Sequence, residues 1–375
     1  MSTSHATLKL VPITHAATAQ CSTADRPSSP RHLSTTPIAT SESPIAPAVY
    51  HPPTSGPLSL LPVSWIPYAE LSRYDKPSGA TYLFLPCLFS TLLAAPLTSP
   101  ITSPITALST AALFYAGALI MRGAGCTIND LWDRDLDPHV TRTRLRPLAR
   151  RAVTPFQALT WLGAQLSAGL VILLQFPPSC FFYATPSLLL VALYPLAKRV
   201  TNYPQFVLGL TFSWGAILGF PALGLDLLAS TPHLVAAGCL YASCVAWTLV
   251  YDMIYAYQDI RDDPKAGIKS IALAQAKHPK TFLSTAAAAQ VGLLAGAGLA
   301  IGAGPVYFGG VCGGAAATLG YMIWRVDLGS VGDCWYWFRK GAWFVGGAIS
   351  AGLGAEYVVR YAGWDGRKVE GVVML

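Results

Sequence analysis

The stretch RGAGCTINDLWDRDLDPHVTRTRLRP, residues 122–147, brings four aspartates and a following run of arginines into a chain that is otherwise very apolar. On a helix, Asp130, Asp133 and Asp137 would lie at i, i+3 and i+7 on one face, with Asn129 at its edge. Carboxylates this close repel one another unless a cation lies among them, and hard oxygen ligands suit Mg²⁺. Taken alone, the stretch fits either a divalent-metal site or a solvated acidic face at a helix end.

The composition around this stretch is that of a membrane protein. Of 375 residues, 53% are hydrophobic and 11% are charged, whereas soluble domains average about 25% charged residues. Apolar runs long enough to span a bilayer recur along the chain. We therefore expect an all-α membrane protein with about nine transmembrane helices, near residues 80–97, 105–124, 156–176, 180–198, 204–224, 234–256, 281–303, 305–325 and 336–359.

The two ends of the chain differ from this apolar body. Residues 1–60 are rich in Ser, Thr, Pro and Ala and contain only two acids, which is typical of an organelle transit peptide or of a disordered cytosolic tail. We favour mitochondrial targeting, because a run beginning at Arg31 resembles a matrix-protease processing site. We expect residues 61–362 to form one polytopic domain and residues 363–375 a C-terminal tail.

Basic residues separate the predicted loops into two sets. The loops after the second, fourth and sixth spans carry many lysines and arginines, whereas those after the first, third, fifth and seventh carry none. By the positive-inside rule, the basic loops face the cytoplasm or the mitochondrial matrix. The net charge of +7 then reports topology and contact with anionic lipid. No basic patch with interleaved aromatic residues indicates nucleic-acid binding.

A second acidic segment ends the sixth predicted span. Asp252, Asp259 and Asp263 would lie at i, i+7 and i+11 on one helical face, which Tyr255 would share. Both acidic segments fall on the same membrane face, and together they hold eight of the eighteen acids in the chain. Two aspartate-rich helix ends that face each other indicate Mg²⁺ ions bridging a diphosphate, with nearby Arg and Lys holding its other oxygens.

The wording of these motifs resembles that of the UbiA superfamily of intramembrane aromatic prenyltransferases. The family's Asn-Asp-x-x-Asp-x-x-x-Asp, Asp-x-x-x-Asp and Tyr-x-x-x-Lys elements are matched by Asn129, Asp130, Asp133 and Asp137, by Asp259 and Asp263, and by Tyr194 and Lys198. The strings around them, and RYDKP at residues 73–77, are similar to those of family members that prenylate 4-hydroxybenzoate. The resemblance covers about residues 66–360 and implies helices around a central polar cavity.

The resemblance also implies a reaction. A polyprenyl group would pass from polyprenyl diphosphate to the ring of 4-hydroxybenzoate, ortho to the hydroxyl, in ubiquinone synthesis. Mg²⁺ would be bound by Asn129, Asp130, Asp133, Asp137, Asp259 and Asp263. The expected substrate-binding residues are Arg73, Lys76, Arg122, Arg142, Arg146, Lys198 and Lys269, and the expected catalytic residues are Asp252, Tyr255 and Tyr194.

Three of these residues have a specific expected role. Tyr255 would stabilise the allylic cation through its ring face, and Asp252 would orient the phenol or take a proton. Arg73 or Lys76 would hold the benzoate carboxylate. The expected location is the mitochondrial inner membrane, with the active site facing the matrix. The lipid bilayer and other ubiquinone-synthesis proteins are the expected partners, and nothing in the sequence fixes the prenyl chain length.

Two alternatives remain open at this point. The first is a farnesyltransferase of the same fold that acts on a polyketide-derived phenol in meroterpenoid synthesis. The second is an ion transporter with intramembrane carboxylates. A transporter would place acids at the middle of its spans, whereas the two acidic segments here lie at span ends on one face.

Overall fold

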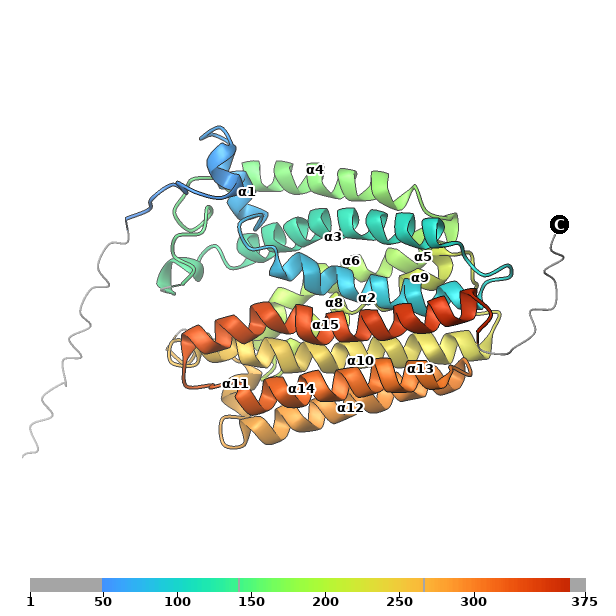
Figure 1. Ribbon diagram of the computed structural model, residues 1–375. Helices are drawn as coiled ribbons and strands as arrows, with labels where there is room; N and C mark the ends of the chain where they lie inside the picture. The colour runs from blue at the N-terminus through green and yellow to red at the C-terminus, as the bar shows by residue number, and fades with distance from the viewer. Residues whose placement is uncertain (1–48, 141, 266, 365–375) are drawn as a thin grey trace, which may run out of the picture. The chain divides into compact units, whose positions relative to one another are not determined.

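The computed structural model describes residues 49–140, 142–265 and 267–364, and every regular element in these ranges is a helix (Figure 1). The predicted transit peptide falls almost entirely on residues 1–48, which lie outside this described part of the chain. The same holds for the predicted C-terminal tail from residue 365 onward.

Nine helical segments in the described ranges are long and apolar enough to cross a membrane, which confirms the predicted number. They are α2 (Ser78–Ala94) with η2 (Ala95–Leu97); α3 (Pro104–Trp132); α4 (Pro155–Leu173); α5 (Pro178–Ala184) with α6 (Pro186–Leu193) and η4 (Tyr194–Leu196); α8 (Pro204–Phe212) with α9 (Gly215–Ala222); α10 (Thr231–Ala256) with η5 (Tyr257–Asp259); α12 (Pro279–Ala300); α13 (Pro305–Tyr307) with η6 (Phe308–Gly313) and α14 (Gly314–Arg325); and α15 (Val331–Tyr361).

Short helices occupy the segments between the spans and before the first of them. They are η1 (Pro57–Leu60), α1 (Ile66–Leu71), η3 (Asp137–His139), α7 (Ala197–Val200) and α11 (Ile271–Ala274). α1 packs beside α3, and it leads through the RYDKP turn into α2. This short helix therefore delivers the residues before the first span to the end of α3 that carries the first acidic segment.

The spans begin at sequence signals that satisfy their first backbone N–H groups. Ser103 and Ser230 accept hydrogen bonds from the third residue of α3 and α10, and Ser330 does the same for α15. Thr154 and Gln157 form a reciprocal capping box at the start of α4. Proline at the first helical turn accompanies most of these caps, because its missing N–H would have no partner there.

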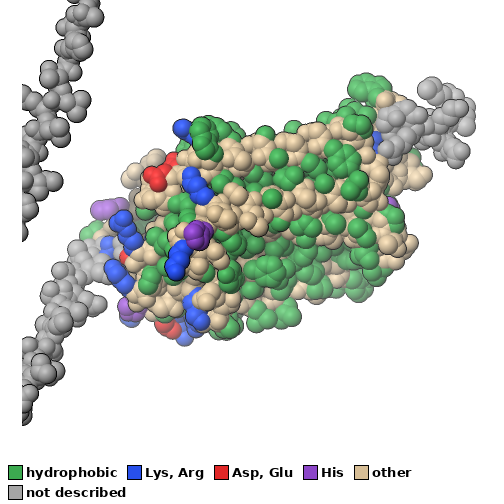
Figure 2. Space-filling view, turned by 90° about the horizontal axis from the view of Figure 1, so that it is seen from below, with side chains coloured by type: hydrophobic (Ala, Val, Ile, Leu, Met, Phe, Trp, Pro, Cys, Tyr) green, Lys and Arg blue, Asp and Glu red, His purple; other side chains and the backbone are tan. Residues whose placement is uncertain are grey.

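The spans alternate in direction, so that both acidic segments come to one end of the bundle. In Figure 1 the loops after α3 and α10 lie at the same end as α1, whereas α15 finishes at the opposite end. Figure 2 shows Lys, Arg, Asp and Glu side chains gathered at one end of the face that it views, with apolar side chains along the rest. This distribution agrees with the sorting of the predicted loops by charge.

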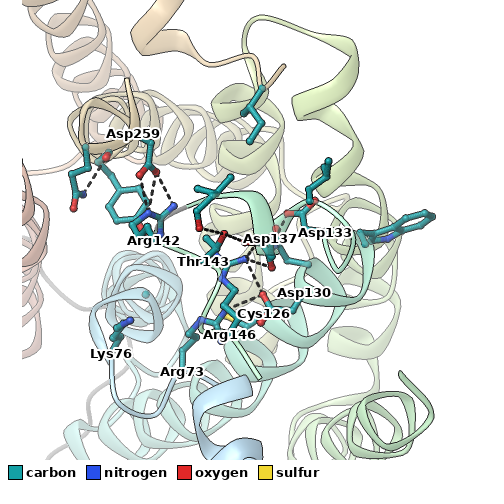
Figure 3. Close-up of a pocket in the computed structure, with 18 of the residues that line it drawn as sticks. Arg73, Lys76, Cys126, Asp130, Asp133, Asp137, Arg142, Thr143, Arg146 and Asp259 are labelled. Carbon is teal, nitrogen blue, oxygen red and sulfur yellow. Dashed lines mark hydrogen bonds and ion pairs between the residues drawn. The ribbon is translucent and has the colours of Figure 1, made fainter. Parts of the chain in front are cut away.

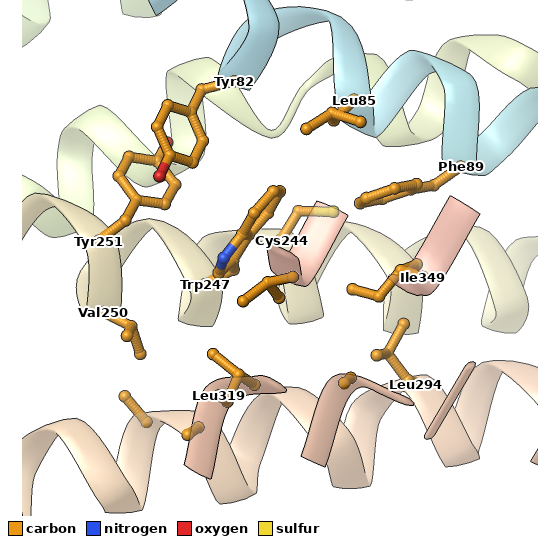
Figure 4. Close-up of a cluster of buried hydrophobic side chains, with 14 of the residues drawn as sticks. Tyr82, Leu85, Phe89, Cys244, Trp247, Val250, Tyr251, Leu294, Leu319 and Ile349 are labelled. Atoms are coloured by element: carbon orange, nitrogen blue, oxygen red, sulfur yellow. The ribbon is translucent and has the colours of Figure 1, made fainter. Parts of the chain in front are cut away.

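The core lies between α2, α10, α12, α14 and α15 (Figure 4). Trp247 of α10 is 1% exposed and meets the rings of Tyr82 and Phe89 of α2 at centroid distances of 5.3 and 5.9 Å. Because lipid is as apolar as these side chains, dense packing rather than escape from water holds such helices together. Gly346 illustrates the density, since an added Cβ would lie 2.4 Å from Leu85 and 3.1 Å from Trp247.

Candidate active site

A cavity of about 1770 Å³ opens among the helix ends that carry the two acidic segments (Figure 3). Residues from α2, α3, α8, α10, α15 and the loop after α3 line it. Every predicted metal-binding, substrate-binding or catalytic residue whose side chain is described lies in its wall. The exception is Lys198, whose side chain lies outside the described part of the structure.

The first acidic segment is divided between a helix end and the turn that follows. α3 ends at Trp132, Asp133 is its C-cap, and Asp137 begins η3. The prediction that Asp130, Asp133 and Asp137 share one continuous helical face is therefore wrong beyond Asp133. Pro138 has no N–H with which to extend the helix through this point. The three aspartates are nevertheless buried, at 0%, 7% and 5% exposure, and all line the cavity.

Two arginines bind the buried carboxylates of this segment. Nη2 of Arg73 donates to both oxygens of Asp130, at 2.8 and 2.7 Å. Nη1 of Arg146 lies 3.1 Å from Oδ1 of Asp130 and donates to both oxygens of Asp137, at 3.0 and 2.9 Å. Buried charges are stable only when they are paired. Asp130 is thus fixed by cations from the turn before α2 and from the loop after α3.

Burial also changes the acidity of Asp137, which lies outside the spans. Loss of contact with water raises the pKa of this carboxyl above its ordinary value, and the nearby Asp130 and Asp133 raise it further. Arg146 opposes the shift by stabilising the carboxylate. Arg146 therefore compensates only part of the cost of keeping Asp137 charged, and a second cation bound at this carboxylate would stabilise its charge further.

The second acidic segment also leaves the α-helix. α10 ends at Ala256 and tightens into η5, so Asp259 and Asp263 do not continue the α-helical face of Asp252, contrary to the prediction. A 3₁₀ turn has 3.0 residues per turn, which rotates later residues relative to an α-helical face. Asp252, Tyr255, Asp259 and Asp263 all line the cavity.

Arg142, in the loop after α3, connects the two acidic segments (Figure 3). Its Nε donates to Oδ1 of Asp259 at 2.9 Å and its Nη2 to Oδ2 at 2.7 Å, while Nη1 donates to the Tyr255 hydroxyl at 2.8 Å. This fork-to-fork pairing is the strong form of an arginine–carboxylate contact. The guanidinium carbon is also 5.3 Å from the centre of the Tyr255 ring.

Asn129 and Tyr194 join the first segment to the end of the fourth span. Nδ2 of Asn129 donates to Oδ2 of Asp133 at 3.2 Å, and the Tyr194 hydroxyl donates to Oδ1 of Asn129 at 3.4 Å. These two hydrogen bonds orient the Asn129 amide from both sides. Arg199, which was not among the predicted site residues, donates from Nη2 to the Trp132 carbonyl at 3.1 Å.

Arg122 lies deeper along α3, in the wall of the cavity but outside its ion-pair network. Its Nη1 donates to Sγ of Cys126 at 2.7 Å, and its guanidinium is 5.5 Å from the centre of the Phe212 ring. It forms no ion pair with a carboxylate among the described residues, and its Nε is buried there without a hydrogen-bond partner. A buried donor without a hydrogen-bond partner is energetically costly.

Lys76 and Lys269 line the more open part of the cavity. Nζ of Lys76 is 3.7 Å from Oδ2 of Asp75, and its side chain is 61% exposed. Nζ of Lys269 donates to the Val200 carbonyl at 3.4 Å. Both ammonium groups retain donors for a bound anion.

Sequence reasoning missed an aromatic wall on the apolar side of the cavity. The rings of Tyr82 and Tyr251 stack at 3.8 Å, and Phe338 approaches Tyr255 at 4.6 Å. Trp335 stacks on Phe338 at 5.8 Å. The aromatic run at the start of the last span, residues 335–338, was the available signal for part of this wall.

A second group missed by sequence reasoning holds the chain before α1 against the cavity. The Tyr50 hydroxyl donates to Oε1 of Glu70 at 2.7 Å, and Nη2 of Arg150 donates to Oε2 at 2.6 Å. The Arg150 guanidinium lies 3.6 Å from the centre of the Tyr50 ring. Burial raises the pKa of the Tyr50 hydroxyl, and its bond to Glu70 adds to the shift. No motif links these three positions in the sequence.

Comparison with known proteins places this arrangement in a family. The sequence profile described as the UbiA prenyltransferase family matches residues 83–346, which include both acidic segments. The chain belongs to the UbiA prenyltransferase family. This result confirms the resemblance drawn from the motifs, and it extends over most of the nine spans.

Curated UbiA-family relatives agree closely with the chain. The mitochondrial 4-hydroxybenzoate polyprenyltransferase of Saccharomyces cerevisiae is 43% identical over 309 residues, which cover 82% of this chain and 80% of that protein. The protein of the same name from Schizosaccharomyces pombe is 41% identical over 296 residues, covering 79% and 81%. The one from Arabidopsis thaliana is 44% identical over 286 residues, covering 76% and 67%.

Solved UbiA structures share the fold. A UbiA homologue from Aeropyrum pernix K1 superposes with a TM-score of 0.57 at 22% identity, covering 74% of this chain and 97% of that one. A UbiA homologue from Archaeoglobus fulgidus, solved with GPP and Mg²⁺, gives a TM-score of 0.57 at 17% identity, covering 79% and 99%. The predicted fold class is confirmed.

The donor chemistry of the UbiA cavity fits Mg²⁺ in one particular way. The described residues contain no group of three or more His, Cys, Asp or Glu side chains close enough to hold an ion by themselves. Mg²⁺ is usually held by one or two carboxylates together with substrate phosphates and water. The buried aspartates on two sides of one cavity supply such carboxylates, so the residues fit a Mg²⁺ ion that is shared with a bound diphosphate.

Proposed function

We propose that the chain transfers a polyprenyl group from polyprenyl diphosphate to the ring carbon of 4-hydroxybenzoate ortho to its hydroxyl, in ubiquinone synthesis. The observation that carries the proposal is the pair of acidic segments joined by Arg142 across one cavity. Diphosphate needs cations on several sides, and this cavity offers both carboxylates for Mg²⁺ and arginines for direct contact. The names of the curated relatives support 4-hydroxybenzoate as the acceptor.

The diphosphate would lie between the two acidic segments. Asn129, Asp130, Asp133, Asp137, Asp259 and Asp263 would hold Mg²⁺, which would neutralise charge on the departing diphosphate. Arg142 and Arg146, now bound to Asp259 and Asp137, would turn part of their donor set to phosphate oxygens. The Archaeoglobus fulgidus homologue was solved with GPP and Mg²⁺, which supports a prenyl diphosphate and Mg²⁺ as the ligands.

The reacting carbon, C1 of the prenyl group, would lie on the apolar side of the diphosphate, against the aromatic wall. As the bond between C1 and the diphosphate oxygen breaks, positive charge develops on the allyl group, and an aromatic ring face stabilises a cation. Tyr255 is suited to this role because its hydroxyl is held by Arg142 at 2.8 Å while its ring packs on Phe338. The prenyl tail would continue between the apolar spans.

The acceptor would enter from the side of Arg122. Arg73 binds Asp130 with both distances below 3 Å, so its guanidinium is engaged. Arg122 pairs with no carboxylate among the described residues, which makes its guanidinium the better candidate for the benzoate carboxylate. A bond then forms between C1 and the ring carbon ortho to the hydroxyl, and the ring proton leaves; Asp252 in the cavity wall would accept it.

The cavity end would face the mitochondrial matrix. The basic loops lie at the same end of the bundle as the acidic segments, and the positive-inside rule assigns such loops to the matrix side of an inner membrane. The curated relatives are named mitochondrial, which supports this location.

A competition assay tests the acceptor. Purified protein in lipid nanodiscs receives one polyprenyl diphosphate, Mg²⁺, and equal amounts of 4-hydroxybenzoate and a polyketide-derived phenol such as orsellinic acid. We expect mass spectrometry to detect prenylated 4-hydroxybenzoate as the main product. Preferential prenylation of the second phenol would favour the meroterpenoid function. Absence of any product and of diphosphate release, with ion flux into vesicles, would favour a transporter.

A further inference from the structure

A second hollow, between α12 and α14, shares no lining residue with the active-site cavity. Its volume is about 600 Å³, and its walls are mainly small or aliphatic. Ala287, Ala288, Ala316 and Gly320 leave it open, and Leu319 at 1% exposure forms part of its floor. A Cβ added to Gly320 would meet nothing within 4 Å. The hollow is therefore an apolar groove on the surface of the bundle, formed by residues of two neighbouring spans.

Polar and aromatic groups close one end of this groove. Lys280, in the first turn of α12, donates from Nζ to the Trp324 carbonyl at 3.2 Å. That bond uses one of three ammonium hydrogens and leaves two for a ligand. Arg325 follows the groove-lining Trp324, and its guanidinium carbon is 5.8 Å from the centre of the 71%-exposed Trp324 ring. Asp327 is near in sequence, but its Oδ1 accepts from the Gly329 N–H at 2.9 Å.

The charged end of the groove is at the headgroup level of the membrane. Lys280 begins one span and Arg325 ends the next, so both lie at the end of the bundle that carries the basic loops. Tryptophan is enriched at this level, where its ring meets both lipid and water. Figure 2 shows basic side chains at one end of this side of the molecule and apolar side chains along the rest. A ligand would thus need an anionic head and an apolar tail.

The size of the groove distinguishes an acyl chain from a helix. A helix with side chains is about 10–12 Å across and rises 5.4 Å per turn, so each turn occupies roughly 500 Å³. The groove would hold little more than one turn of such a helix. A lipid tail is a single row of methylene groups and can lie along the groove.

We propose that the α12–α14 groove binds one anionic diacyl phospholipid. Its phosphate contacts Lys280 and Arg325, and one of its two acyl chains lies along Gly320. Basic pockets between transmembrane helices on the matrix or cytoplasmic side bind such headgroups. The site is separate from the diphosphate cavity and does not depend on the proposed reaction. Membranes rich in anionic lipid would stabilise the α12–α14 pair in particular.

Native mass spectrometry of the full chain tests this site. Protein in zwitterionic detergent is titrated with phosphatidylglycerol, with phosphatidylcholine of the same acyl chains, or with inorganic phosphate. The variant Gly320→Leu fills the groove, and Gly292→Leu, at an exposed α12 position outside the groove with equally open space, is its matched control. Lys280→Ala removes the charge and leaves the groove open.

We expect one phosphatidylglycerol to bind more tightly than phosphatidylcholine. Gly320→Leu should weaken its binding about tenfold or more, Lys280→Ala about fivefold, and Gly292→Leu should leave it unchanged. Equal binding of both lipids, or unchanged binding in Gly320→Leu, would overturn the proposal. It would also be overturned by binding of inorganic phosphate alone, or by a dimer that Gly320→Leu converts to a monomer, since the occupant would then be an ion or a second copy.

Discussion

Nη2 of Arg142 lies 2.7 Å from Oδ2 of Asp259, although the two residues are 117 positions apart in the chain. This contact ties the loop after α3 to the end of α10. Because each partner belongs to a different acidic segment, the pair fixes the separation of the two sides of the cavity. A bound diphosphate would meet both sides at once.

Arg142→Lys tests the fork geometry separately from the charge. Lysine keeps the cation but cannot pair with both Asp259 oxygens and the Tyr255 hydroxyl. Charge-assisted hydrogen bonds contribute about 1.5–3 kcal/mol, so we expect kcat/KM for the prenyl diphosphate to fall about 10- to 100-fold. Steady-state kinetics in nanodiscs would measure it, with exposed Arg261→Lys, outside the cavity wall, as the control. Equal activity of both variants would contradict a phosphate role for Arg142.

Asp130→Asn removes a buried charge on which two arginines converge. Breaking a buried ion pair costs about 3–5 kcal/mol, so we expect a lower thermal midpoint. We also expect prenyl transfer to need at least several-fold more Mg²⁺. Asp262→Asn, at a position outside the cavity wall, should change neither quantity. A loss of stability with an unchanged Mg²⁺ requirement would assign Asp130 to structure alone.

Two substitutions of Tyr255 distinguish the role of its ring from the role of its hydroxyl. Tyr255→Phe removes the acceptor of the Arg142 hydrogen bond and keeps the ring face, whereas Tyr255→Leu removes both. A cation–π contact contributes about 2 kcal/mol when it is shielded from water. We therefore expect kcat to fall about 10- to 30-fold in Tyr255→Leu and to change little in Tyr255→Phe. Single-turnover rates would show it, and equal losses in both variants would rule out a role for the ring.

Glu356 and Arg360 provide a test of stability without chemistry. Their side chains are 6% and 8% exposed at the end of α15 opposite the cavity, and Nε of Arg360 lies 2.9 Å from Oε1 of Glu356. Oε1 also accepts from the Gly304 N–H at 2.8 Å. Glu356→Gln should lower stability by about 3 kcal/mol while the activity per folded molecule stays unchanged. A selective loss of activity would show coupling between the two ends of the bundle.

The sequence was sufficient to predict the spans and to pick out residues that line one cavity. Apolar length and loop charge depend on local composition, so the nine spans and the common end of both acidic segments could be predicted. The positions of Asp137 and Asp263 relative to the preceding helix could not be predicted. Each residue lies beyond the end of its α-helix, where the conformation of a turn sets the direction of the side chain.

Pairings between distant segments were also out of reach. The bond between Arg73 and Asp130 and the Tyr50–Glu70–Arg150 group join positions with no shared periodicity. Sequence spacing predicts which residues share a helix face but not which cation reaches which carboxylate across a cavity. The sequence also could not predict that Nε of Arg122 is buried without a hydrogen-bond partner. That property depends on the positions of Phe212 and Cys126 beside the guanidinium.

The central claim is that the two acidic segments form one diphosphate site. Its most direct test is an experimental structure of the protein in lipid nanodiscs with Mg²⁺ and a non-hydrolysable thiolodiphosphate analogue of the prenyl donor. The account predicts the diphosphate between Asp130 and Asp259, with Mg²⁺ on aspartates of both segments and Arg142 on a phosphate oxygen. A diphosphate bound at one segment only, or outside the cavity, would contradict it.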